Sequence, residues 1–258
     1  MTGTLETALR AARAQGRKLL VPYVTGGLGE WCDVVAASAA AGADACEVGI
    51  PFSDPVMDGP TIQHASERAL EAGATPPAII DALGQIDAGI PLAVMTYYNI
   101  AFHMGHERFA SSLRSAGVSA AILPDLPLEE VGPWATVADE VGIETVLLAA
   151  PTAPDERLPR ICERARGFVY AVGLLGVTGE RARLASTATV IARRLKDVTD
   201  KPVLVGVGIS TPEQAVEACE VADGVVVGSA LVRRILEGAS PEEAAEVIAG
   251  FRAALDRG

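Results

Sequence analysis

Short hydrophobic runs alternate with longer amphipathic segments from one end of the chain to the other. The runs, many of them β-branched, predict strands at Leu19–Val24, Ala45–Ile50, Leu92–Tyr97, Ala120–Pro124, Thr145–Ala149, Phe168–Val172, Val203–Val207 and Gly224–Val227. The alanine-rich segments between them predict helices, which include Trp31–Ala41, Thr61–Ala72, Arg108–Ala116, Pro133–Val141, Asp155–Ala165, Ala188–Val198, Thr211–Cys219 and Pro241–Leu255. Hydrophobic strands separated by helices are typical of a parallel sheet with both faces covered.

Eight such units in 258 residues favour a closed (β/α)₈ barrel, or TIM barrel, over an open doubly wound sheet. An extra helix is expected before the first strand. No linker, low-complexity segment or change of composition divides the chain, so residues 1–258 are expected to form one catalytic domain. Barrels of this kind carry their active sites at the C-terminal ends of the strands. The residues that follow each strand are therefore the candidates for function.

The acidic composition argues against two kinds of binding partner, nucleic acids and anionic membranes. The net charge is −12 and the sequence pI is about 4.7, so the surface should repel nucleic acid and anionic membranes. The first sixteen residues lack an apolar signal core, and no run is long enough to cross a bilayer, so a soluble cytoplasmic protein is expected. The four cysteines have no paired spacing and predict buried thiols in a reducing compartment.

A glutamate stands inside the second expected strand, between Cys46 and Val48. Burial of an unpaired carboxylate is costly, so Glu47 is expected to have a raised pKa and to be ready to transfer a proton. The loop that follows is stiffened by three prolines and brings a second carboxylate, Asp58, to a Gly-Pro turn. Two carboxylates in different surroundings at one strand end indicate a divided acid–base task.

These carboxylates also have structural interpretations. Glu47 could form a structural ion pair, although its own strand offers no basic partner. Asp54 and Asp58 could simply cap turns, as aspartate often does. Asp125, which lies between two prolines, could be a turn residue or could hold the loop at 47–60 by hydrogen bonds.

Four tyrosines add to the polar side chains near the expected strand ends. Tyr23, Tyr97 and Tyr98 could do no more than fill the barrel mouth. Tyr170 is better placed for chemistry, because its hydroxyl should lie at the end of the sixth strand beside the glycine-rich loop 173–179.

Glycine-rich turns follow the last two strands, where barrels commonly bind phosphate. Glycine lets backbone N–H groups approach an anion closely, and a helix N-terminus favours negative charge. Gly208, Gly228 and Ser229 are therefore candidate phosphate-binding residues, and Gly179 could add a donor from the sixth loop. The alternative is that these glycines are only turns. The segment 210–213 also predicts a capped helix start with proline in its first turn.

Other kinds of active site find little support. The three lysines are Lys18, Lys196 and Lys201, and all are expected on the far side of the barrel, which argues against a Schiff-base aldolase. His103 and His106 lack a third ligand for a metal pair, and His64 falls early in a helix. No dinucleotide fingerprint follows the first strand. The chemistry is expected to use carboxylates, a tyrosine and backbone donors, with no metal and no tightly held cofactor.

At this point the motifs resemble those of the tryptophan synthase α subunit family. The signature match is the segment from Glu47 to Pro55 together with Asp58-Gly59-Pro60-Thr61-Ile62-Gln63. Supporting matches appear in family order over nearly the whole chain: Pro22–Gly27, Met95–Asn99, Asp125-Leu126-Pro127, Gly176–Gly179, Gly206–Ser210 and Gly228-Ser229.

The resemblance implies retro-aldol cleavage of indole-3-glycerol phosphate to indole and D-glyceraldehyde 3-phosphate. Glu47 matches the family's acid–base, Asp58 the carboxylate that accepts the indole N–H, and Tyr170 an active-site tyrosine. The remaining matches assign phosphate binding to Gly179, Gly208, Gly228 and Ser229, and contacts with substrate or loops to Tyr23, Tyr97, Thr178 and Asp125. Just before its Gly-Val-Thr-Gly motif the chain has Gly173-Leu174-Leu175, where the family often has polar residues.

The resemblance also implies a partner. The family normally works in an α2β2 assembly with a β subunit that holds pyridoxal phosphate, so no cofactor is expected in this chain. Asp54 and Pro55 lie where that partner is contacted. Three other functions stay open: a free-standing indole-releasing lyase, a non-catalytic phosphate-binding barrel subunit, and another phosphate-binding barrel enzyme.

Overall fold

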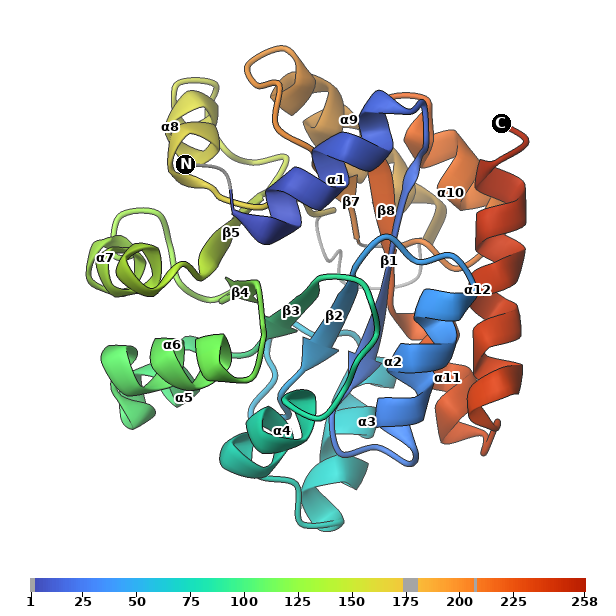
Figure 1. The fold of residues 1–258 in the computed structure, drawn as a ribbon. Helices are drawn as coiled ribbons and strands as arrows, with labels where there is room; N and C mark the ends of the chain where they lie inside the picture. The colour runs from blue at the N-terminus through green and yellow to red at the C-terminus, as the bar shows by residue number, and fades with distance from the viewer. Residues whose placement is uncertain (1–2, 174–180, 207) are drawn as a thin grey trace.

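Eight parallel strands close into a single barrel, as the alternation predicts (Figure 1). The computed structural model describes residues 3–173, 181–206 and 208–258. Each strand pairs with the next along the chain, and β1 closes the barrel against β8, with Leu19 opposite Gly224. The strands are β1 Leu19–Thr25, β2 Cys46–Gly49, β3 Leu92–Met95, β4 Ala120–Ile122, β5 Glu144–Ala149, β6 Val169–Ala171, β7 Val203–Val205 and β8 Gly224–Val227.

Twelve helices are found in the described residues, and they form the outer layer around the strands (Figure 1). They are α1 Thr4–Ala14, α2 Trp31–Ala40, α3 Pro60–Glu71, α4 Pro76–Leu83, α5 Tyr98–Met104, α6 His106–Ser115, α7 Gly132–Val141, α8 Arg157–Arg164, α9 Arg181–Lys196, α10 Pro212–Cys219, α11 Ser229–Leu236 and α12 Pro241–Leu255. The last helix, α12, packs beside α2, which brings the two ends of the barrel sequence together.

Three of these helices, α4, α5 and α11, were not predicted from the hydrophobic pattern. Each is only seven or eight residues long, so its helical period is weak, although α8 and α10, which are also eight residues long, were predicted. The third strand is also shorter than predicted. It ends at Met95, because Tyr97 already serves as the N-cap of α5.

Helix α1 lies at the N-terminal end of the barrel and is capped by a residue far along the chain. Its own N-cap, Gly3, offers no side chain. Instead the Glu144 carboxylate, at the start of β5, accepts the backbone N–H groups of Leu5 at 2.7 Å and Glu6 at 3.0 Å. A Cβ on Gly3 would lie 2.3 Å from Glu144 Cδ, so a side chain there would displace the capping carboxylate. The extra helix predicted from the sequence is confirmed, and its capping partner is a tertiary contact.

We expect Glu144→Ala to lower the free energy of unfolding by about 1–2 kcal/mol, the usual cost of a lost N-cap. The substitution leaves the first N–H groups of α1 without their acceptor in a buried place. Urea denaturation would measure the loss. Glu140→Ala is the matched control, because Glu140 is exposed on α7, and it should change stability by less than about 0.5 kcal/mol. Equal effects of the two variants would contradict the capping role.

The N-terminal end of the barrel is held by carboxylates that bind strand N–H groups. Asp44 accepts the N–H of Leu20 at 2.8 Å, and Asp223 accepts that of Val203 at 2.8 Å. Asp223 also pairs with Lys196 at 2.8 Å. These carboxylates have structural partners, in contrast to Glu47 on β2, which has no hydrogen-bond partner among the described residues.

Candidate active site

Glu47 is a buried carboxylate without a partner. It is 1% exposed, and among the described residues neither of its side-chain oxygens has a hydrogen-bond partner. Burial, with a smaller contribution from Asp58, raises the pKa of Glu47 to about 8. The structural ion pair considered from the sequence is therefore wrong, and the expected raised pKa is confirmed. A carboxyl group in this state holds a proton at neutral pH and can donate it.

The register of the sheet decides what surrounds Glu47. On β1 its neighbour is Tyr23, and on β3 it is Ala93, whose small side chain leaves room beside the carboxyl group. Tyr170 on β6 faces Glu47 from another part of the barrel wall, and Glu47 contributes, after burial, to the raised pKa of Tyr170. The structure thus brings together Glu47, Tyr23 and Tyr170 from three separate strands.

Asp58 stands at the end of the loop between β2 and α3, close enough to Glu47 to influence its ionisation. Burial raises the pKa of Asp58 to about 6, and a hydrogen bond with the Tyr97 side chain opposes the rise. Asp58 is therefore ionised at neutral pH while Glu47 is protonated. The two carboxyl groups predicted to divide an acid–base task differ in environment as that task requires.

Tyr97 holds the loop that carries Asp58. Its hydroxyl accepts the backbone N–H of Met57 at 2.8 Å, and its ring stacks on Phe52 with centroids 5.2 Å apart. Asp125 lies in a turn after β4, which confirms the first of the two alternatives considered from the sequence. It accepts the backbone N–H of Tyr98 at 2.8 Å and so fixes the start of α5, next to Tyr97. Among the described residues, the Asp125 side chain makes no hydrogen bond to the loop at 47–60, so its support of that loop runs through Tyr98 and Tyr97.

Two glycines make room for the tyrosine rings. A Cβ on Gly49 would lie 1.9 Å from the Tyr23 hydroxyl, and a Cβ on Gly206 would lie 2.1 Å from the Tyr170 ring. Neither glycine could carry a side chain without displacing a buried aromatic ring. These roles were not predicted from the sequence. A glycine at the end of a strand can make room for a phosphate or for a tyrosine ring, and the sequence alone does not distinguish the two.

The candidate phosphate cradle lies after β7 and β8. Gly228 is the N-cap of α11, so the first backbone N–H groups of that helix, beginning with Ser229, have no partner inside the helix. Gly208 has a φ of +88°, a conformation that favours glycine. Thr211 caps α10 in a capping box with Gln214, which confirms the predicted capped start. Gln214 also accepts the N–H of Ser210, so that donor is already occupied.

Two predicted site residues, Thr178 and Gly179, lie outside the described residues, as do Leu174 and Leu175. The loop after β2 is described, and most of its tip, residues 53–57, is exposed. Asp54 on this loop accepts a hydrogen bond from Ser53 at 2.6 Å. Its neighbours Val56 and Met57 are 76% and 42% exposed, which is unusual for apolar side chains.

The lysines lie where the sequence places them, at the N-terminal end of the barrel. Lys18 donates to the carbonyl of Cys219 at 2.6 Å, and Lys201 donates to that of Cys162 at 2.7 Å. Among the described residues no group of three or more histidine, cysteine, aspartate or glutamate side chains could hold a metal ion. His106 begins α6 and lies 3.0 Å from the Tyr98 hydroxyl.

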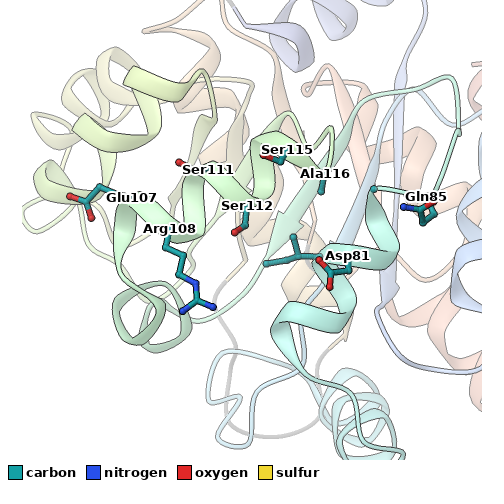
Figure 2. A pocket seen from close by; sticks show the side chains of 10 residues that line it. Asp81, Gln85, Glu107, Arg108, Ser111, Ser112, Ser115 and Ala116 are labelled. Atoms are coloured by element: carbon teal, nitrogen blue, oxygen red, sulfur yellow. The ribbon is translucent and has the colours of Figure 1, made fainter.

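A groove of about 660 Å³ opens elsewhere, between α4 and α6 (Figure 2). Its walls carry Asp81 and Gln85 on one side, and Arg108 and Ser112 on the other. Most of these side chains are exposed, and none of the predicted site residues lines the groove. This groove is therefore separate from the carboxylate site.

Comparison with known proteins decides the family. The family model described as "Tryptophan synthase alpha chain" matches residues 9–254. This chain belongs to the tryptophan synthase alpha chain family. The alpha chain of Thermobifida fusca is 42% identical over 261 residues, which cover 98% of this chain and 97% of that relative. The alpha chain of Streptomyces coelicolor is 43% identical over 250 residues, which cover 93% and 90%.

Solved structures agree with this assignment. Tryptophan synthase from Mycobacterium tuberculosis superposes with a TM-score of 0.90 at 36% identity, covering 99% of each chain. Tryptophan synthase subunit alpha from Legionella pneumophila has a TM-score of 0.89 at 32% identity, covering 100% of each chain. The closed barrel is that of the tryptophan synthase alpha chain, and the resemblance read from the motifs is confirmed. The chain is a lyase of the family that catalyses the α reaction of tryptophan synthase, in tryptophan biosynthesis.

The described residues also contain no helix long and apolar enough to cross a membrane.

Proposed function

We propose that Glu47, Asp58 and Tyr170 carry out the retro-aldol cleavage of indole-3-glycerol phosphate to indole and D-glyceraldehyde 3-phosphate. The observation that carries this proposal is the pairing of a protonated Glu47, which has no hydrogen-bond partner among the described residues, with an ionised Asp58 at one end of the barrel. Such a pair supplies both an acid and an anion within one site.

Glu47 first donates its proton to the ring carbon of the indole that bears the glycerol chain. The positive charge that develops on the ring is stabilised by Asp58, which accepts the indole N–H. Glu47, now a carboxylate, takes the proton of the adjacent side-chain hydroxyl. The electron pair of that O–H bond forms the aldehyde carbonyl, the C–C bond breaks, and its electrons restore the aromatic indole. Glu47 ends the cycle protonated, so the proton balance closes without another group.

Tyr170 lies beside Glu47, and Tyr23 and Tyr97 form the walls near the two carboxylates. At the other end of the substrate, we propose that the backbone N–H groups at Gly208, Gly228 and Ser229 bind the phosphate. The unpaired first turn of α11 and the positive φ of Gly208 support this assignment. Thr178 and Gly179 keep the roles that the resemblance implies.

The cleavage needs neither a metal nor a tightly held cofactor in this proposal, because protein carboxyl groups perform both proton transfers. Pyridoxal phosphate belongs to the β partner. The exposed apolar side chains of Val56 and Met57, beside Asp54 and Pro55, support a partner interface at the loop after β2. We propose an α2β2 assembly through this loop. The single domain at 1–258 and the cytoplasmic location stay predictions.

Release of indole from indole-3-glycerol phosphate tests the proposal. The purified chain should release indole slowly alone and much faster with the β subunit from the same source. Fast release without the β subunit would favour the free-standing lyase instead. No release under either condition would contradict the proposed substrate and leave a phosphate-binding barrel subunit.

A further inference from the structure

Tyr23 has a hydroxyl group at the centre of the site. It lies on β1 directly opposite Glu47 on β2, and it is only 5% exposed. Its Cβ lies 3.6 Å from the position of a Cβ on Gly228, and its hydroxyl occupies the space over Gly49. The tyrosine thus spans the mouth from the candidate phosphate cradle to the end of β2.

The position of the hydroxyl along β2 follows from the geometry of a strand. Gly49 is two residues beyond Glu47, so both face the same side of the sheet, and Gly49 is nearer the barrel mouth. A hydroxyl over Gly49 therefore lies beyond Glu47, on the side from which the loop returns with Asp58. Since an added methyl at Gly49 would lie 1.9 Å from it, this position exists only because residue 49 is glycine.

The two buried phenols, Tyr23 and Tyr170, differ in which carboxyl group influences their ionisation more. Burial raises the pKa of Tyr23, and Asp58 is the next largest cause. The Thr25 side chain opposes the rise, and Glu47 makes a smaller contribution than either. For Tyr170 the order is reversed, and Glu47 stands ahead of Asp58. Both phenols therefore lie within electrostatic range of both carboxyl groups, with Asp58 the larger influence on Tyr23 and Glu47 the larger influence on Tyr170.

We propose that Tyr23 is a positioning residue whose hydroxyl donates a hydrogen bond to the Asp58 carboxylate in the working enzyme. Asp58 would then be held by two phenols, Tyr97 from the end of β3 and Tyr23 from β1. The inference rests on the proposed function, since it assigns a task to the surroundings of Asp58. Asp58 influences the ionisation of Tyr23, so the two groups lie within electrostatic range, but no direct hydrogen bond joins them; catalytic hydrogen bonds commonly tighten when substrate binds.

Among the described residues, four titratable groups influence the ionisation of Asp58 or are influenced by it. They are Glu47 on β2, Tyr97 after β3, Tyr23 on β1 and Tyr170 on β6. Glu47 is protonated while Asp58 ionises, so it provides no positive charge to favour the carboxylate. Hydrogen-bond donors are therefore the groups available to stabilise Asp58 as an anion, and a donated bond lowers the pKa of a carboxyl group.

Tyr23→Phe tests this role, because it removes the hydroxyl and keeps the ring between Gly228 and Gly49. The acid limb of the pH profile of kcat/KM, set by ionisation of Asp58, should move upward by about one pH unit. Carboxyl ¹³C NMR should show the pKa of Asp58 rising by a similar amount. Tyr98→Phe is the matched control, since the Tyr98 hydroxyl bonds His106 outside the barrel, and it should move neither quantity.

An unchanged acid limb and an unchanged Asp58 titration in folded Tyr23→Phe would overturn the proposal. A higher KM without either shift would indicate that Tyr23 only packs against substrate. The NMR titration needs no turnover, so it reports on Tyr23 even if the chain proves inactive on indole-3-glycerol phosphate. Failure of this inference and failure of the proposed function are therefore distinguishable. The melting temperature of each variant confirms that it is folded.

Discussion

Glu47→Gln is expected to lower the rate of indole release by about 10²–10⁴-fold, the usual contribution of a general acid–base group. The amide has nearly the shape of the carboxyl group but cannot transfer a proton. Because Glu47 has no hydrogen-bond partner among the described residues, the substitution breaks no structural contact. The measurement is steady-state indole release from indole-3-glycerol phosphate by the purified variant.

Substrate binding should survive this substitution, because the phosphate donors lie after β7 and β8 and are untouched. The Kd for substrate, measured by calorimetry, should stay within about threefold of the wild-type value, which corresponds to less than 1 kcal/mol. Glu140→Gln on the surface of α7 is the control for charge removal and should keep full activity. Normal turnover by Glu47→Gln would show that another group is the acid–base.

The rate of cleavage should depend on pH in a direction set by the raised pKa of Glu47. The pKa of Glu47 is raised to about 8, so its proton is available below that pH and the rate should fall as pH rises through it.

The stability of the fold should also fall as pH rises. A carboxyl group whose pKa is raised on folding contributes stability at pH below its unfolded pKa, near 4.5, and that contribution is lost as pH rises through about 8. Glu47→Gln should remove this loss and be more stable than the wild type at pH 9.

Asp58→Asn is expected to reduce kcat/KM by about 10²–10³-fold, comparable to the loss of a charge-stabilising group in other active sites. The neutral amide cannot stabilise the positive charge on the indole ring. The carboxylate of Asp58 forms as pH rises through about 6, where its pKa lies, so activity of the wild type should fall below that pH. The wild-type profile should therefore be bell-shaped between about 6 and 8.

The control for this substitution is Asp81→Asn, an exposed aspartate on α4 that lines the groove between α4 and α6. It should retain wild-type kcat/KM and the same pH profile. If Asp58→Asn also retained the wild-type rate, Asp58 would have only the turn role that aspartate often has. Loss of folding is separated from loss of chemistry by the circular dichroism spectrum of each variant.

Much of the chemistry could be predicted from the sequence because its signals are local. Glu47 is conspicuous as the one acidic residue within a strand otherwise made of Cys, Val, Gly and Ile, and its raised pKa follows from burial alone. The eight strands follow from hydrophobic runs of a few residues, and all eight are confirmed with small shifts at their ends. The short helix α11 was not predicted, although its first backbone N–H groups, which have no acceptor within the helix, form part of the proposed phosphate cradle.

Residue identity and periodicity alone determined the class of the fold and the carboxylates at the strand ends, because hydrophobic spacing is a property of neighbours along the chain. The family followed from the resemblance of motifs and their order to those of a known family. Only the tertiary structure decided which partners these residues have. Glu144 caps a helix 138 residues away, Tyr97 ties down the loop of Asp58, and the Tyr23 hydroxyl occupies the space over Gly49. These contacts join distant segments. They depend on the register of the barrel strands and on which side chain fills which space. Neither can be predicted from the local pattern of hydrophobic and polar residues.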